Sequence, residues 1–144
     1  MHNVMNQLVE QLHAGNRSLV VGNGDGVTAY DGRGLQDLLR LLADGKGVLK
    51  GASVADKVVG KAAAALMIEG GVAQVYAELI SSQAVKLLEA YGVVFSYGTL
   101  TDHIINRAGT GWCPMELCCR DLATPAECHT AILHKIEEFK QQKQ

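Results

Sequence analysis

Side chains with the chemistry of a functional site stand in this sequence beside predicted helix starts. Asp56 lies next to Lys57, and Ser81 and Ser82 follow an apolar run. A carboxylate at such a place can act as a general base or a polar anchor, while serine hydroxyls and free backbone N–H groups can bind an anion. Both residue types also have a structural explanation, because an acid stabilises a helix N-terminus and a serine caps one.

Lys57 and Lys61 stand four residues apart, so they share one face of a predicted helix. The pair could bind a phosphate or a carboxylate of a ligand, or it could be an ordinary solvated surface. Gly60 lies between them, where a glycine inside a helix costs about 1 kcal/mol relative to alanine. Close packing against a strand or against a ligand would account for this glycine, and both explanations stay open.

A second group of candidate residues lies in and after a glycine-rich loop. Cys113 precedes Pro114 and Glu116, and Asn106 and Arg107 stand shortly before it as candidate ligand-binding residues. A nearby arginine or a helix N-terminus lowers the pKa of a thiol, so Cys113 is a candidate nucleophile and Glu116 a candidate acid or base beside it. The alternative is a structural cysteine in front of a short helix.

The cysteine spacing does not predict a metal site. The four cysteines form no C-x-x-C pair, and the adjacent Cys118 and Cys119 would point in different directions on a regular element. We therefore expect no bound metal and no cofactor. His103, close to Asp102, is the histidine nearest to the proposed site, because the others fall on predicted terminal helices.

The elements that must position these residues lie mainly within residues 53–97, which predict the order helix, strand, helix, strand. Apolar residues recur with helical spacing from Ala55 to Leu66, and two glycines end this helix. The apolar runs 72–80 and 93–97 are typical of buried parallel strands, joined by a helix that begins at Ser81–Ser82. A pocket in such a sheet forms beyond the carboxyl ends of the strands, where Asp56 and the two serines would lie.

The flanking segments complete a prediction of one α/β domain spanning residues 1–144. Residues 1–15 and 124–144 predict terminal helices, 18–21 and 27–30 a hairpin, and 35–43 and 101–107 short helices. The glycines between the hairpin strands have the wrong spacing for a dinucleotide-binding fingerprint. We expect a mixed sheet of four to five strands, and whether residues 115–117 supply the fifth stays open.

Three stretches of the sequence resemble the DUF1893 family of the cytidine deaminase-like superfamily. They are D-K-V-V-G-K-A-A-A from Asp56, V-Y-A-E-L-I-S from Val75, and C-P-M-E from Cys113. The resemblance implies a three-layer α/β/α cytidine deaminase-like fold without an assigned activity. Active deaminases hold zinc with H-A-E or C-A-E at one helix start and P-C-x-x-C at the next. Neither motif is present here, which argues against zinc-dependent deamination.

The composition narrows the class of partner. With 48% hydrophobic and 19% charged residues and a net charge of −2, the chain has ordinary globular usage and no basic stripe for nucleic acid. Its apolar runs are shorter than the ~20 residues of a membrane span, so we expect no membrane partner. The expected location is cytoplasmic, with reduced cysteines.

These observations predict a zinc-free pocket that binds a small polar or nucleotide-like molecule, with chemistry that depends on Cys113 or Asp56 if the protein is an enzyme. The alternative is a non-catalytic binding or oligomerisation module that has lost deaminase activity. A homodimer is expected in either case. Cys113 beside Asp56 or Ser81 in one concave pocket would favour the enzyme.

Overall fold

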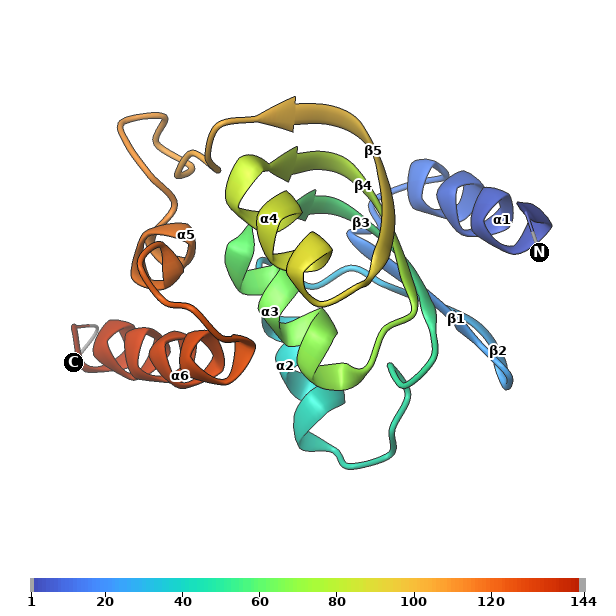
Figure 1. Ribbon diagram of the computed structural model, residues 1–144, viewed down its shortest axis with the longest axis horizontal. Coiled ribbons are helices and arrows are strands. Elements are labelled where there is room, and N and C mark those ends of the chain that lie inside the picture. Colours follow the sequence, from blue (N-terminus) through green and yellow to red (C-terminus); the bar gives the residue numbers. More distant parts are fainter. Residues whose placement is uncertain (1, 143–144) are drawn as a thin grey trace.

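The computed structural model describes residues 2–142, which form a five-stranded sheet with helices on both faces (Figure 1). The strand order is β2-β1-β3-β4-β5; β1 runs antiparallel to β2 and β3, whereas β3, β4 and β5 are parallel. The strands are β1 (Leu19–Asn23), β2 (Gly26–Tyr30), β3 (Ser53–Val59), β4 (Gln74–Ser81) and β5 (Val94–Thr101). The prediction of a mixed sheet in an α/β fold is confirmed.

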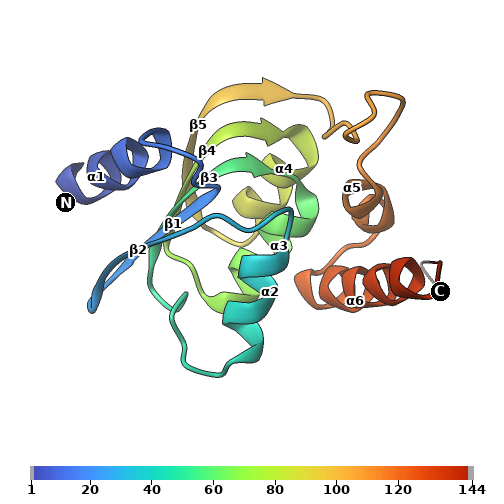
Figure 2. The same cartoon turned by 180° about the vertical axis from the view of Figure 1, so that it is seen from behind.

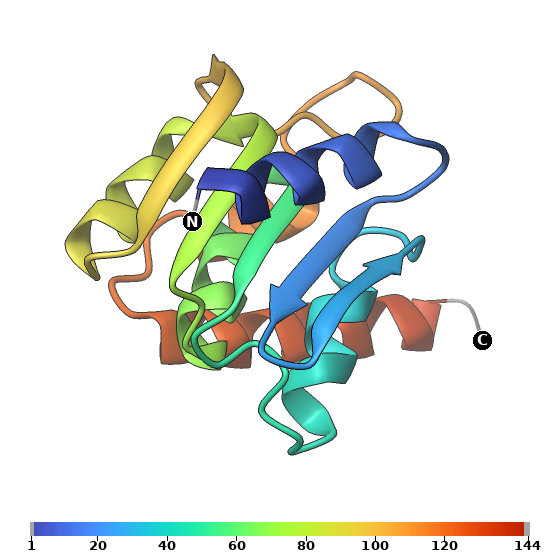
Figure 3. The same cartoon turned by 90° about the vertical axis from the view of Figure 1, so that its right-hand side faces the viewer.

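The helices form two unequal layers around this sheet. Helix α1 lies across one face, and the other five helices lie on the opposite side, with α5 and α6 farthest from the sheet (Figures 2 and 3). The helices are α1 (His2–His13), α2 (Gln36–Ala43), α3 (Lys61–Gly70), α4 (Ser82–Ala90), α5 (Pro114–Cys119) and α6 (Pro125–Gln142). None of the helices within residues 2–142 is long and apolar enough to cross a membrane.

Apolar side chains fill the space on both faces of the sheet. On the larger side, α3 is the central helix, and its residues 62–67 are almost completely buried. Four of these six residues are alanines, and such small side chains let α3 approach the strands and α6 closely. On the other face, Leu8 and Leu12 of α1 pack against Val20 and Ala55. Burial of each leucine stabilises the fold by about 1.5–3 kcal/mol.

The prediction of one helix across residues 53–69 was wrong, because its first part is the strand β3. Val54 and Ala55 are both fully buried, one on each face of the sheet, so a short apolar run there fits a strand as well as a helix. Gly60 ends the strand and forms the N-cap of α3 in an extended conformation. Strand β3 therefore completes the five-stranded sheet. Residues 115–117, which were the candidate for a fifth strand, belong to α5.

The predicted short helix over residues 101–107 is also absent from this part of the structure. Strand β5 continues to Thr101, which pairs with Ser81 of β4, and a loop follows that is closed by a bridge between Ile105 and Trp112.

Two sequence signals for helix starts are confirmed. The Ser81 hydroxyl accepts a hydrogen bond from the Ala84 N–H at the start of α4, and residues 124–127 form the predicted capping box before α6.

Candidate functional site

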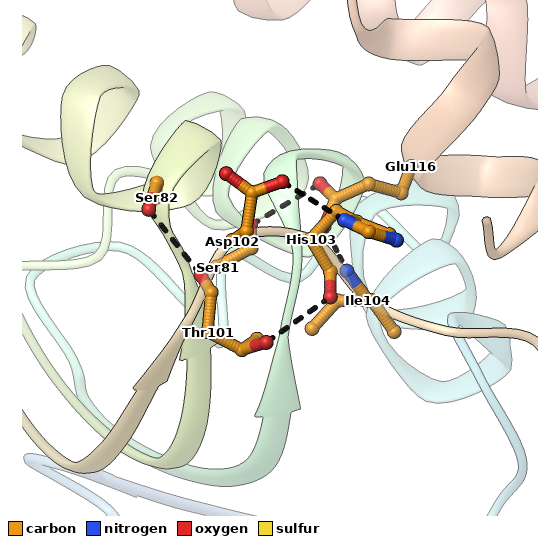
Figure 4. Close-up of polar contacts among 7 residues, drawn as sticks. All are labelled: Ser81, Ser82, Thr101, Asp102, His103, Ile104 and Glu116. Carbon is orange, nitrogen blue, oxygen red and sulfur yellow. Dashed lines mark hydrogen bonds and ion pairs between the residues drawn. The ribbon is translucent and has the colours of Figure 1, made fainter.

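Glu116 of α5 lies at the meeting point of three elements. Its side chain is only 1% exposed. Oε1 accepts hydrogen bonds from the Lys61 N–H at 2.7 Å and from the Ser81 hydroxyl at 3.2 Å, while Oε2 accepts one from the Ile104 N–H at 2.8 Å. Figure 4 shows the contacts with Ser81 and Ile104. These donors come from the start of α3, the start of α4 and the loop after β5. The buried carboxylate is therefore fully engaged by the protein.

Two of these donors lie at helix starts, and the Lys61 N–H is the one that the helix backbone itself leaves without a partner. The first N–H groups of a helix have no partner within the helix and carry a partial positive charge, so they favour an anion. Lys61 is the first residue of α3, and Ser81 is the N-cap of α4. The place where the sequence predicted an external ligand is thus filled by the protein's own Glu116.

Gly60 packs closely against this carboxylate. A Cβ atom at Gly60 would lie 3.2 Å from both Glu116 oxygens and 3.0 Å from Cγ1 of Ile104, closer than ordinary contacts. Its φ of −92° is open to any residue, so space and not backbone conformation requires glycine here. The sequence left open close packing against a strand or against a ligand; the close packing found is against Glu116 of α5 and Ile104 of the loop after β5.

Lys61 forms hydrogen bonds with both ends of α5 and so connects this helix to α3. Its backbone N–H binds Glu116 near the start of α5, and its Nζ donates to the carbonyl oxygens of Arg120 at 3.1 Å and Leu122 at 2.5 Å just beyond the helix end. A cation at the carboxyl end of a helix also complements the negative partial charge there. Lys57 does not share this environment, because it lies in β3 and not on the same helix face.

Asp56 lies within β3, paired with Leu19 of β1, and not at a helix start as predicted. Its Oδ1 accepts a hydrogen bond from the Val58 N–H at 3.3 Å. Burial raises the pKa of Asp56 to about 7; hydrogen bonds from the backbone of Val58 and Lys57 oppose the increase, and the charge of Asp37 adds to it. Among the hydrogen bonds of residues 2–142, none joins Asp56 to Ser81 or Glu116.

The loop after β5 is held by a chain of polar contacts. The Ser82 hydroxyl donates to the Thr101 carbonyl at 3.3 Å, and the Thr101 hydroxyl donates to the His103 carbonyl at 3.4 Å (Figure 4). His103 Nδ1 lies 3.0 Å from Asp102 Oδ2, and the His103 ring stacks on Trp112 with a centroid distance of 4.1 Å. Ser82 therefore connects α4 with the end of β5, where this loop begins.

The remaining predicted residues lie in or beside the same loop. Asn106 closes the loop tip, because its side chain donates to the Thr110 hydroxyl and accepts from the Thr110 N–H. Arg107 is exposed at this tip. Cys113 is half-buried at the N-cap of α5, where its N–H donates to the Ile104 carbonyl at 2.8 Å. No hydrogen bond within residues 2–142 joins the Cys113 thiol to any of the predicted partners.

A concave site of about 470 Å³ lies beside this arrangement, and we call it the α4 cavity. Its lining residues come from the start of α3, from α4 and from the segment around α5: Lys61, Gln83, Lys86, Leu87, Ala90, Trp112, Arg120 and Ala123. Three of these described residues are basic and none is acidic. The Arg120 guanidinium lies over the Trp112 ring, 5.3 Å from its centroid.

Gln83 adds a hydrogen-bonding group to the α4 cavity. Its Oε1 is buried and has no hydrogen-bond partner within the described residues. Buried polar atoms of this kind are rare, since an unsatisfied acceptor costs about 1–3 kcal/mol. Of the residues that line this cavity, only Lys61 was predicted from the sequence; Gln83, Lys86, Trp112 and Arg120 were not. The sequence signal that could have pointed to this cavity is Trp112, the only tryptophan in the chain, directly before Cys113.

Within residues 2–142, no three His, Cys, Asp or Glu side chains come together in a way that could bind a metal ion.

Comparison with known proteins gives one family and a matching structure. A family model described as a domain of unknown function (DUF1893) matches residues 7–136. A crystal structure of a DUF1893 family protein from Thermotoga maritima is similar to this chain with a TM-score of 0.85 and 27% sequence identity. That similarity covers 94% of this chain and 91% of the other. No curated protein matches the sequence.

Proposed function

Since the chain belongs to the DUF1893 family, whose description assigns no activity, we propose from the geometry of the α4 cavity that it binds a small anionic, nucleotide-like molecule. The observation that carries this proposal is a cavity with three basic side chains, no acidic one and an unpartnered buried amide oxygen. Of the three, Lys61 Nζ donates to two backbone carbonyls and Arg120 Nε lies 3.6 Å from Asp121 Oδ1, whereas no ion pair within residues 2–142 engages Lys86. An excess of basic over acidic groups attracts an anion.

Each group in the α4 cavity suits a different part of such a ligand. Lys86 is exposed and free to pair with a phosphate or carboxylate, and the Arg120 guanidinium can bind the same group with two parallel hydrogen bonds. Trp112 lines the same cavity, but the His103 ring already stacks on it and the Arg120 guanidinium lies over it, so a flat base would stack there only by displacing one of these groups. Gln83 Oε1 would accept a hydrogen bond from an N–H or O–H of the ligand.

The proposal favours a binding module over an enzyme. Glu116 holds three donors in place, so a role in proton transfer would require these hydrogen bonds to break. Asp56 and Cys113 are not among the residues that line the α4 cavity. We assign Glu116 a positioning role and give Asp56 and Cys113 no catalytic role in this proposal.

The relation to the cytidine deaminase-like superfamily is part of the same proposal. The order of hairpin, strand, helix, strand, helix and strand supports it. In that relation the starts of α3 and α4 would correspond to the helix starts that hold zinc in active deaminases. Glu116 would then occupy the place of the metal with a carboxylate, and ligand binding would have moved to the neighbouring α4 cavity.

Tryptophan fluorescence tests the binding proposal directly, because Trp112 is the only tryptophan in the chain and lines the α4 cavity. Titration with AMP should give a saturable change in emission that weakens as salt is added. Adenosine, which lacks the phosphate, should bind more weakly. Absence of a response to AMP and to inorganic phosphate at millimolar concentration would refute the proposal.

Substitutions of basic residues sharpen this test. Lys86→Ala and Arg120→Ala should each weaken AMP binding about tenfold, since a hydrogen bond to a charged group contributes roughly 1.5–3 kcal/mol. Lys46→Ala is the matched control, because Lys46 is an exposed lysine outside the α4 cavity. An equal loss of affinity in Lys46→Ala would mean that the binding is nonspecific charge attraction.

A second candidate function, formation of a homodimer, has its own observation. Strand β5 is an edge strand of eight residues without a charged residue or proline. Three of its four apolar side chains are open to solvent, with Val94 66%, Tyr97 43% and Leu100 48% exposed, whereas Phe95 is half-buried against the core. Natural proteins usually protect such an edge with charges or bulges, because it pairs readily with another strand. We propose that two copies pair through β5.

Light scattering after gel filtration tests this dimer. The wild-type protein should have the mass of two chains, and Leu100→Lys should have the mass of one, because a charge on the edge opposes pairing. Val4→Lys on α1 is the control, since Val4 is similarly exposed at 41%. A wild-type protein that stays monomeric as its concentration is raised would exclude the proposed pairing.

A further inference from the structure

Three of the four cysteines gather where α5 packs against α6. Cys118 and Cys119 lie at the end of α5, and Cys128 lies in the first turns of α6. The sulfur atoms of Cys118 and Cys119 are 3.8 Å apart, and the Cys119 sulfur lies 3.9 Å from the Cys128 carbonyl oxygen. All of these thiols are free. The arrangement places two thiols in direct contact at a helix end, so the expectation that Cys118 and Cys119 point in different directions was wrong.

Only one of the three is accessible to a reagent. Cys119 and Cys128 are completely buried, whereas Cys118 is half-buried. Cys118 lines a second cavity, of about 640 Å³, formed mostly by α6, and Lys135 and Glu138 lie in the same lining. We call it the α6 cavity. A small molecule that enters the α6 cavity can reach the Cys118 sulfur without unfolding of the helices.

The surroundings of Cys118 also make it the more acidic of the two contacting thiols. The hydrogen bond with Cys119 and the nearby charge of Lys135 lower the pKa of Cys118 to about 7, against the opposing effects of burial and of Glu138. The same hydrogen bond, with burial, raises the pKa of Cys119. A thiolate is the nucleophilic form of cysteine, so Cys118 is partly activated at neutral pH while Cys119 holds its proton.

We propose that Cys118 is a site of reversible oxidation by a peroxide, with Cys119 as the resolving thiol. The Cys118 thiolate attacks one oxygen of the peroxide, the O–O bond breaks, and the leaving hydroxide takes a proton to become water. Cys118 is then a sulfenic acid. Cys119 loses its proton and attacks the Cys118 sulfur, and hydroxide leaves and is protonated to a second water. One peroxide is reduced, and two thiols are oxidised to one disulfide.

The position of the pair at the end of α5 makes this step feasible and reversible. A disulfide needs its sulfurs about 2.05 Å apart, so the two side chains must approach each other. Neighbouring Cα atoms are about 3.8 Å apart, closer than the usual 4.4–6.8 Å of a disulfide, so the ring would be strained and readily reduced. Cys119 is the last residue of α5, and the required change therefore falls at a helix terminus.

Peptide mass spectrometry of the full chain after treatment with hydrogen peroxide tests the proposal. The wild-type protein should form a Cys118–Cys119 disulfide that dithiothreitol reverses. In Cys119→Ser, a sulfenic acid that reacts with dimedone should accumulate on Cys118, and Cys118→Ser should lose both products. Cys113 is the internal control, because it is also half-buried but lacks a neighbouring thiol among the described residues. Oxidation of Cys113 ahead of Cys118, or a disulfide between another pair, would overturn the proposal.

A second pair of variants leaves the thiols intact, which protects the test against misfolding of the cysteine variants. The rate of Cys118 alkylation by iodoacetamide should rise through an inflection near pH 7 in the wild type. Lys135→Gln should move this inflection to higher pH, and Glu138→Gln should move it to lower pH, since their charges act on Cys118 with opposite signs. Unchanged inflections in both folded variants would contradict the assigned activation.

Discussion

Replacement of Asp56 with asparagine should stabilise the protein at neutral pH. Asp56 is the acid within β3 whose pKa is raised to about 7 by burial, compared with 3.8 for an ordinary aspartate. Between these two values, the folded protein binds a proton that the unfolded chain has already lost. Stability must therefore fall as the pH rises from about 4 to 7 and then level off.

The size of this effect follows from the difference between the two pKa values. From 3.8 to about 7 is roughly three units, and at 1.36 kcal/mol per unit this is at most about 4 kcal/mol of unfolding free energy. Because Asp56 keeps part of its surface in solvent, we expect about 2–4 kcal/mol. Asp56→Asn removes the charge and keeps an oxygen that can accept the hydrogen bond from Val58. The gain should thus be present at pH 8 and nearly absent at pH 4.

Urea unfolding followed by circular dichroism, repeated from pH 4 to pH 9, measures this gain. The wild-type unfolding free energy should decrease across the acidic range, and Asp56→Asn should flatten that decrease. Asp121→Asn is the control, because the Asp121 side chain is 85% exposed. If Asp56→Asn keeps the wild-type pH slope, or is less stable than wild type at pH 8, the assigned burial of the charge is wrong.

Three further substitutions test the contacts around Glu116, each by urea unfolding. Glu116→Ala should lower the unfolding free energy by about 2–4 kcal/mol, because it leaves two buried N–H groups without an acceptor; wild-type stability would contradict this. Gly60→Ala should lower the unfolding free energy by about 1–3 kcal/mol, because the added methyl group crowds the carboxylate. Gly15→Ala is the control and should leave the unfolding free energy near that of the wild type, because the space around Gly15 is open. Lys61→Met should destabilise the attachment of α5, whereas Lys86→Met, at the exposed side of the same cavity, should leave stability near wild type. Equal effects of the two lysine variants would refute the attachment role.

The elements that local chemistry specifies could be predicted from the sequence. Ser81 marks the start of α4 because a serine cap needs only the next few residues, and the capping box at Thr124 marks α6 for the same reason. Strand β3 could not be predicted, since its short apolar pattern fits both the periodicity of a helix and that of a strand. The buried environment that decides between them comes from α1 and α3 on opposite faces.

The site depends on contacts that no local pattern contains. Glu116 is separated from Lys61 by 55 residues and from Ser81 by 35. The residue types marked all three as candidate site residues, but the sequence could not predict that they form hydrogen bonds with one another. The reactive cysteine shows the same limit. Cys113 was selected for its loop and its neighbouring arginine, whereas the two thiols that contact each other are those of Cys118 and Cys119, which no motif marked.

Helix α5 connects the two proposals, because the residues at its end contribute to both cavities. Arg120 lines the α4 cavity, Cys118 lines the α6 cavity, and Lys61 Nζ binds the Arg120 carbonyl between them. A disulfide between Cys118 and Cys119 would distort the helix end that carries Arg120. Oxidised protein should therefore bind AMP more weakly than reduced protein in the Trp112 titration, and by thermodynamic reciprocity AMP should oppose formation of the disulfide. Peroxide-treated Cys118→Ser should keep the affinity of the reduced form. Identical titration curves for the oxidised and reduced wild-type protein would show that the two cavities act independently.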